Sequence, residues 1–168
     1  MSSLAYRQIE PQDKAFIFDS WLESFRTSHS AGLIAMNDWR EVMAPQLEKV
    51  LARPGVKVLV AHRPGEVDRT ADIYGWLAIE RDYQIPVRSY GSEGNQISKM
   101  AAALLPLVHY VFVKQPYRRL GIARGLFNAA GVNPNQHFAY TCKTAVVSRL
   151  SDKIPNASWQ PLVARFPK

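Results

Sequence analysis

The sequence predicts a single α/β domain in which helices flank a central mixed, mostly antiparallel β-sheet. Three observations predict this class. Apolar runs of strand length alternate with segments of helical periodicity along most of the chain, an order typical of sheets covered by helices. The length of 168 residues suits one hydrophobic core. The apolar fraction of 47% offsets the entropy of ordering such a chain, so we expect one domain over residues 1–168.

The first third of the chain predicts a short strand followed by two amphipathic helices. We expect the strand at residues 4–9 and the first helix at residues 14–25, where large apolar side chains repeat at helical spacing. Asn37 or Asp38 can cap the second helix, which ends before Pro54. Both helices therefore precede the main part of the sheet.

The rest of the chain alternates between strands and helices. Residues 56–62 and 72–80 predict two strands joined by a charged turn, so an antiparallel pair is the natural result. Residues 84–106 form an unusually long connection, in which we expect a short helix at residues 97–105. A strand, a helix, a strand, a short helix and an extended segment follow at residues 107–113, 120–130, 138–142, 145–150 and 159–166.

Composition excludes several classes of protein. The apolar, uncharged stretch at residues 100–113 is too short and too interrupted to span a bilayer, and the polar start lacks the layout of a signal peptide. Cys142 is the single cysteine, so an internal disulfide is impossible and no metal site is expected. We therefore expect a soluble cytoplasmic protein without a membrane partner.

The net charge of +7 is confined to one part of the chain. Residues 1–100 hold 12 Lys and Arg against 13 Asp and Glu, a balance of −1. Residues 101–168 hold 9 Lys and Arg against Asp152 alone, a balance of +8. A local positive field of this kind suits a polyanion, which can be a nucleic acid, a membrane surface or a phosphorylated cofactor.

One junction in the second half carries chemistry. After the strand that ends at Val113, a basic loop leads into a helix whose first turn contains Gly121 and the small Ala123. Free backbone N–H groups and the positive end of the helix dipole converge there, which favours binding of a pyrophosphate. Gly121 allows close approach of the ligand. The guanidinium groups of Arg118, Arg119 and Arg124 add positive charge around the same anion.

The six residues from Arg118 to Ala123 match the signature of the GNAT N-acetyltransferase superfamily: Gln or Arg, two residues, Gly, one residue, then Gly or Ala. The resemblance implies a GNAT-like acyl-CoA N-acyltransferase fold with acetyl-CoA as co-substrate. It implies that the backbone of Phe112 and Val113 pairs with the pantetheine arm and that backbone amides from Arg118 through Ala123 hold the pyrophosphate. The implied binding residues after the strand are Arg118, Arg119, Leu120, Gly121, Ile122, Ala123 and Arg124. Residues 19–26 also resemble the opening of GNAT-like proteins often encoded by phages and prophages, which implies the cytoplasm of a host.

Two features depart from the family pattern. Pro116 lies three residues after Val113 instead of two, so one residue is added or the turn differs. The tyrosine that often serves as general acid is missing, and the expected helix at residues 145–150 offers only Ser148. Tyr140 or Cys142 can substitute for it, although neither stands at the family position. Binding of the co-substrate is therefore better supported than turnover.

The general base has four candidates. His109 and Tyr110 lie on the expected strand, and Glu80 and Asp82 lie at the end of the preceding one. An imidazole with a pKa of about 6.5 can accept a proton from an amine directly or through water. His109 can equally be a core residue, since it shares one face of the expected strand with Leu107, Val111 and Val113. Glu80 can equally be a solvated strand end.

Three functions remain open from the sequence. The first is an N-acetyltransferase whose amine acceptor, a small molecule or a protein, is unknown. The second is a catalytically silent GNAT-fold phage protein that acts as a binding or virion-associated module, alone or as a homodimer. The third is a nucleic-acid binder, which ranks last because no interleaved aromatic and basic platform is present. The remaining basic residues can form a solvated face or bind a partner: Arg149, Lys153, Arg165 and Lys168.

Overall fold

A computed structural model of the chain describes residues 4–28, 30–64, 72–84, 104–133, 136–144 and 157–159. Its helices and strands follow in the order β1 (Ala5–Gln8), η1 (Pro11–Asp13), α1 (Lys14–Thr27), η2 (Ser30–Leu33), α2 (Met36–Leu51), β2 (Val56–His62), β3 (Ile73–Gln84), β4 (Leu104–Val113), η4 (Gln115–Tyr117), α3 (Ile122–Ala129), β5 (Phe138–Tyr140) and β6 (Ala157–Trp159). The helix expected at residues 145–150 lies outside the described residues, as does most of the one expected at 97–105. Residues 104–105 belong to β4, so the prediction of a helix there is wrong.

The six strands form one mixed sheet in the order β1-β2-β3-β4-β5-β6. The first four strands pair antiparallel with their neighbours, and β5 and β6 continue the sheet in parallel. A parallel neighbour requires a crossover connection, and α3 supplies it between β4 and β5. The predicted fold class, a mixed and mostly antiparallel sheet flanked by helices, is confirmed.

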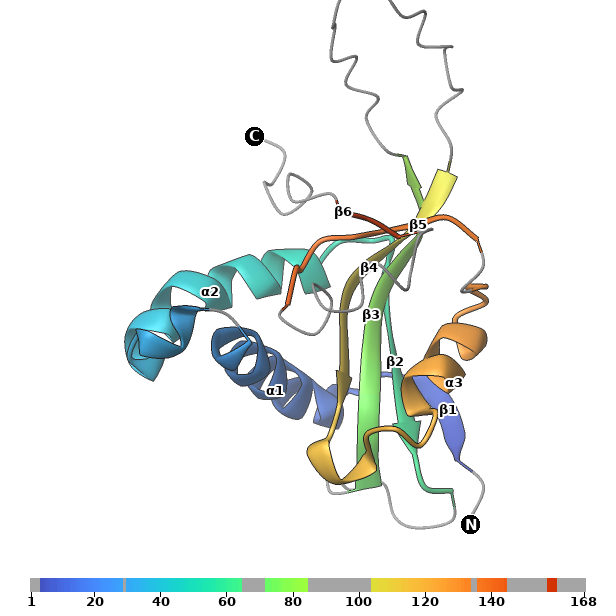
Figure 1. The fold of residues 1–168 in the computed structure, drawn as a ribbon, viewed down its shortest axis with the longest axis horizontal. Helices are drawn as coiled ribbons and strands as arrows, with labels where there is room; N and C mark the ends of the chain where they lie inside the picture. Colours follow the sequence, from blue (N-terminus) through green and yellow to red (C-terminus); the bar gives the residue numbers. More distant parts are fainter. Residues whose placement is uncertain are drawn as a thin grey trace, which may run out of the picture.

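The helices lie on both faces of the sheet (Figure 1), with α1 and α2 on one face and α3 on the other. The face under α1 and α2 is rich in aromatic side chains, among them Trp21, Trp39, Trp76 and Tyr110. The cluster between the sheet and α3 is mainly aliphatic and includes Leu77 of β3 and Leu126 of α3, both completely buried. Trp21 on α1 and Trp39 on α2 are both buried in the aromatic cluster on the opposite face.

The starts of two helices differ from the predictions. Helix α2 begins at Met36 with Ala35 in the cap position, so Asn37 and Asp38 lie in its first turn and neither caps it. Helix α3 begins at Ile122, two residues later than expected, because Gly121 before it has a left-handed backbone with φ of 80°. Helical hydrogen bonding cannot pass through a residue in that conformation.

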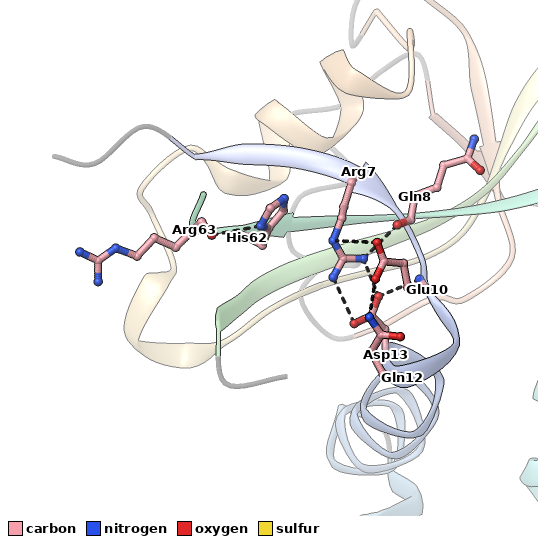
Figure 2. Close-up of polar contacts among 7 residues, drawn as sticks. All are labelled: Arg7, Gln8, Glu10, Gln12, Asp13, His62 and Arg63. Atoms are coloured by element: carbon pink, nitrogen blue, oxygen red, sulfur yellow. Dashed lines mark hydrogen bonds and ion pairs between the residues drawn. The ribbon is translucent and has the colours of Figure 1, made fainter. Parts of the chain in front are cut away.

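A buried ion pair fixes the turn from β1 into α1 (Figure 2). Arg7 Nη1 lies 2.6 Å from Asp13 Oδ2, and Arg7 Nη2 lies 3.3 Å from Oδ1. The backbone amide of Glu10 donates to Asp13 Oδ2 at 2.8 Å. Burial raises the pKa of Asp13, but the hydrogen bonds from Arg7 and Glu10 outweigh it, so the pKa lies below its usual value. The carboxylate therefore stays ionised and anchors α1 against the sheet edge.

The helices that the structure describes give no membrane-crossing candidate, because none is both long enough and apolar enough. Among the same described residues, no group of three His, Cys, Asp or Glu side chains is arranged to hold a metal ion.

Candidate functional site

Strand β4 is the branch point of the sheet. Strand β3 pairs with it from Leu104 to Val113, whereas β5 pairs with it only at Leu107 and Val108. The amide of Thr141 donates to the carbonyl of Val108 at 3.0 Å, and this bond marks the point we call the β4–β5 fork. Beyond the fork, residues 110–113 have no strand partner on that side among the described residues. Unpaired edge groups of this kind can bind an extended ligand.

A β-bulge lies at the fork. Ala78 of β3 stands opposite Tyr110, and the next residue, Ile79, stands opposite Val108, so His109 is the extra residue on β4. The hydroxyl of Thr141 donates to the carbonyl of His109 at 3.2 Å. The bulge therefore places His109 where β4 and β5 begin to separate.

The bulge also corrects the predicted orientation of His109. Strict alternation predicted that His109 shares a face with Val111 and Val113. Those two valines pack in the cluster under α3, whereas His109 contacts Glu80 and so lies toward the end of α2. One extra residue in a strand reverses which face the next side chains occupy.

The loop after β4 is anchored to β3. The amide of Lys114 donates to the carbonyl of Tyr74 at 2.9 Å, and the ring of Tyr117 packs on the ring of Tyr74 with centroids 4.3 Å apart. Residues Gln115–Tyr117 form a single turn of 3₁₀ helix, η4, which accommodates the additional residue before Pro116. The added residue between Val113 and Pro116 is therefore taken up by a compact turn, and α3 still begins close to β4.

The N-terminus of α3 presents unpaired backbone donors. The first intrahelical bond runs from the amide of Gly125 to the carbonyl of Gly121 at 2.9 Å, so the amides of Ile122, Ala123 and Arg124 precede the helical ladder. No side chain caps this end. Among the described residues, a Cβ atom at Gly121 would meet nothing within 4 Å, so the residue just before these amides is not packed against the rest of the fold. Such an end attracts an anion.

The side chains around this end carry positive charge. Arg118, Arg119 and Arg124 are exposed, and Arg119 has a left-handed backbone with φ of 68°. One predicted donor is already used, because the amide of Arg118 donates to the carbonyl of Gln115 at 3.3 Å. Arg118 Nε donates to the carbonyl of Val113 at 3.2 Å instead. Binding of a pyrophosphate by the amide of Arg118 would therefore require this bond to Gln115 to be exchanged for the ligand.

The apolar residues of the motif hold α3 in place. Ile122 is buried against the face under α3, and Leu120 is exposed. Gly125, one turn into the helix, lets α3 lie against β1, since a Cβ atom there would be 1.8 Å from the hydroxyl of Tyr6. Phe112 faces the other side of the sheet, where its ring stacks on Trp76 with centroids 6.0 Å apart.

Near the middle of β4, at the fork, three ionisable side chains meet. Arg53, just after α2, places Nη2 2.9 Å from Oε2 of Glu80 on β3. His109 Nε2 lies 3.6 Å from the same Oε2, slightly beyond hydrogen-bond distance. The His109 side chain is only 2% exposed, and neither ring nitrogen has a hydrogen-bond partner among the described residues. Glu80 and His109, two separate candidates in the sequence, are thus neighbours in the fold.

Burial controls the protonation of His109. It lowers the pKa of His109 to about 4, because desolvation and the charge of Arg53 outweigh the attraction of Glu80 for the imidazolium. His109 is therefore neutral at pH 7 and able to accept a proton. Glu80 also borders an open cavity of about 440 Å³, which is lined by Pro54, Gly55, Lys57, Glu80, Arg81 and Asp82.

The other candidate bases and acids lie elsewhere. The hydroxyl of Tyr110 is 3.0 Å from Ser24 Oγ, and burial raises the pKa of Tyr110 to about 12, so it stays protonated. Burial also raises the pKa of the Cys142 thiol to about 11, and Cys142 packs against the aromatic cluster. Tyr140 packs on the α3 side of the sheet. Ser148 lies outside the described residues, as do Arg149, Lys153, Arg165 and Lys168.

Sequence reasoning missed Arg53 as a member of the cluster. The signal lay in the register of the predicted strand pair, in which Val56 stands opposite Glu80. Arg53, three residues before Val56, then lies beside the carboxylate of Glu80. Gly55 belongs to the same arrangement, because a Cβ atom there would be 3.0 Å from Glu80 Cγ.

Neither a protein-family model nor a curated protein sequence matches this chain. Solved structures are similar to it at low identity, and the following three are acetyltransferases. The aminoglycoside antibiotic 6'-N-acetyltransferase AAC(6')-Ih from Acinetobacter baumannii is 16% identical over 99% of this chain and 92% of that chain, with a TM-score of 0.45. The aminoglycoside N-acetyltransferase AAC(6')-Iy in complex with CoA is 14% identical over 100% and 90%, with a TM-score of 0.49. An acetyltransferase from Vibrio fischeri is 13% identical over 76% and 83%, with a TM-score of 0.46.

Proposed function

We propose that this chain is an N-acetyltransferase of the GNAT superfamily that takes acetyl-CoA as co-substrate and an amine as acceptor. The observation that carries the proposal is the uncapped N-terminus of α3 behind Gly121, which lies at the end of the unpaired edge of β4. A diphosphate and an extended amide-bearing arm are the two ligand parts that these two features suit. The sequence signature over Arg118 to Ala123 stands at this same junction.

The binding residues have separate tasks in this proposal. The amides of Ile122, Ala123 and Arg124 donate to the pyrophosphate, and the exposed guanidinium groups nearby neutralise its charge. The edge of β4 up to Val113 binds the pantetheine arm through backbone groups. Arg118 Nε now bonds the carbonyl of Val113, so it exchanges that bond for the ligand when the edge is used.

The cluster at the fork supplies the acid–base chemistry in this proposal. Acetyl-CoA provides a thioester, whose acetyl group is the one transferred. Neutral His109 is the general base, because it is unprotonated at pH 7 and lies where β4 and β5 separate. It accepts the proton that the amine nitrogen loses when the new C–N bond forms. The C–S bond of the thioester breaks in the same transfer, and CoA leaves as a thiolate that takes up a proton from water. The acceptor class remains an amine of unassigned identity, and the general acid is unassigned among the described residues.

The proposal is tested by acetyl-CoA binding to wild type and to Gly121→Glu in isothermal titration calorimetry. A carboxylate beside the pyrophosphate repels it, and about 1.4 kcal/mol of repulsion weakens binding about tenfold, so we expect a loss of that size or larger. Val42→Glu adds the same charge on an exposed position of α2 and serves as the matched control with wild-type affinity. Equal affinity of Gly121→Glu and wild type, with both proteins folded, contradicts the site assignment.

Turnover separates the two GNAT hypotheses. Release of the free CoA thiol is measured with a panel of small primary amines and peptide amines, and any activity must disappear in Gly121→Glu. Acetyl-CoA binding without transfer to any amine favours the catalytically silent binding module. Absence of saturable binding by wild type overturns the proposed function itself.

A further inference from the structure

We propose that Arg53 is a positioning residue for His109, acting through Glu80, so that the three side chains work as one unit. The inference rests on the proposed function for its catalytic meaning. Its structural basis is the chain of contacts from Arg53 Nη2 to Glu80 Oε2 at 2.9 Å and from Oε2 to His109 Nε2 at 3.6 Å. Glu80 and His109 are then two parts of one base rather than alternatives.

Glu80 is held from two sides. Arg53 Nη2 contacts both carboxylate oxygens, at 2.9 Å for Oε2 and 3.2 Å for Oε1. On the other side, Gly55 leaves the space that the Glu80 side chain occupies, since a Cβ atom there would lie 3.1 Å from Oε1. Without Arg53, the carboxylate can turn toward the open cavity, where Lys57 and Arg81 also lie. Arg53 therefore keeps Oε2 directed at the imidazole.

The direction of Oε2 decides which ring nitrogen carries the proton. A carboxylate beside Nε2 favours the tautomer with the hydrogen on Nε2, since an ionised carboxylate accepts and cannot donate. Nδ1 is then the unprotonated nitrogen, and it has no hydrogen-bond partner among the described residues. Contacts of this kind are often long before substrate binds and shorten in the complex. The unit thus presents Nδ1 as the proton acceptor.

Each charged member acts on His109 with a known sign. The carboxylate of Glu80 on β3 stabilises the imidazolium, and the guanidinium of Arg53 after α2 destabilises it. The β5 side presents the hydroxyl of Thr141, which bonds the carbonyl of His109. Loss of Glu80 and loss of Arg53 must therefore shift the titration of His109 in opposite directions.

The test is a histidine ¹⁵N NMR titration of the full chain, with the His109 signals assigned from His109→Gln. Wild type is expected to show the Nε2–H tautomer at pH 7. Glu80→Gln should lower the pKa of His109 and Arg53→Gln should raise it, each by about one unit, the lower end of the effect of a nearby charge. Arg53→Gln should also mix the tautomers, and Arg53→Lys, which keeps the charge, should restore the pKa.

Matched variants keep the outcome decisive. Arg40→Gln removes an arginine of α2 from its exposed pair with Asp19 on α1 and should leave His109 unchanged. If Arg53→Gln does not fold, Gly55→Ala displaces Glu80 without removing a charge and should mix the tautomers in the same way. An Nδ1–H tautomer in wild type, or an unchanged titration in Arg53→Gln or Gly55→Ala, overturns the inference.

Failure of this inference is distinguishable from failure of the proposed function. The NMR readout needs neither acetyl-CoA nor an acceptor, whereas the proposed function fails when acetyl-CoA does not bind wild type. Once an amine is accepted in the turnover panel, Arg53→Gln should lower kcat about tenfold or more, within the range for general base catalysis, and leave acetyl-CoA affinity unchanged. A loss of acetyl-CoA affinity with unchanged kcat contradicts the positioning role.

Discussion

Two regions of β4 differ in burial and in how their charges are paired: the fork at His109, which we call the buried end, and the exposed end that leads to α3. At the fork, His109 is almost completely buried, and the neighbouring charges of Glu80 and Arg53 are paired with each other. At the α3 end, Arg119 and Arg124 are exposed around a helix end that no side chain caps. Paired charges at a buried site tune protonation and stability, whereas exposed charges without such pairing are available to a ligand. One strand thus joins a buried cluster of paired charges to an exposed basic loop.

The same difference appears in the backbone. A bulge at His109 turns the side chain of the buried end toward Glu80, so packing and electrostatics determine its properties. At the exposed end, Arg119 and Gly121 both have left-handed backbones, and the conformation itself shapes the loop. Substitutions should therefore act through pKa and solvation at the first end and through backbone strain at the second.

The largest effect is expected at the buried end, as a dependence of stability on pH. The pKa of His109 is about 4 in the folded chain and about 6.5 when unfolded. Between those values the unfolded state binds more protons, so stability is complete above pH 6.5 and falls as the pH is lowered toward 4. Integration gives a loss of about 2 kcal/mol between pH 7.5 and pH 5.

Urea unfolding at the two pH values measures that loss. His109→Gln should remove this part of the pH dependence, whatever its effect on stability at pH 7.5. His137→Gln, at an exposed position, is the matched control and should retain it. An equal pH dependence in His109→Gln and wild type would show that His109 is not held neutral by burial.

A smaller effect is expected at the exposed end from Gly121→Ala. Nothing lies within 4 Å of the new Cβ atom, so the cost is the left-handed backbone alone, about 1 kcal/mol for a residue with a side chain. Gly121→Asn should cost less, because asparagine adopts this conformation more readily. Thermal and urea unfolding check both variants. A loss of several kcal/mol would indicate that side-chain packing also constrains this end.

The smallest effect is expected from Arg119→Gly. Glycine relieves the left-handed strain at φ of 68° but adds entropy to the unfolded chain, so we expect a net gain of about 0.5 kcal/mol. Arg118→Gly is the matched control, since Arg118 has an ordinary extended backbone with φ of −68° and can only lose stability. Equal losses in the two variants, measured by urea unfolding, would mean that the conformation of Arg119 carries no strain.

Much of the fold could be predicted because it depends on local patterns. The strand predicted at residues 56–62, the helix predicted to begin at Lys14 and the helix predicted to end before Pro54 all agree with the structure. Periodic apolar side chains determine which face of each element is buried. The bulge at His109 could not be predicted, because nothing in the alternation of residues 107–113 marks an extra residue. Such a bulge depends on how β3 and β4 pair along their length. Pro106, also on β4, has no backbone N–H to donate to that pairing.

The sequence by itself determined the junction of strand, basic loop and helix, because Gly121, Ala123 and three arginines lie within seven residues and act through local backbone geometry. Only the tertiary structure decided that His109, Glu80 and Arg53 meet. These three residues come from different elements, and the register of the β2–β3 and β3–β4 pairs brings them together. The pKa of His109 and the pairing of the three side chains depend on burial and on distances between chain segments, which a linear sequence does not contain.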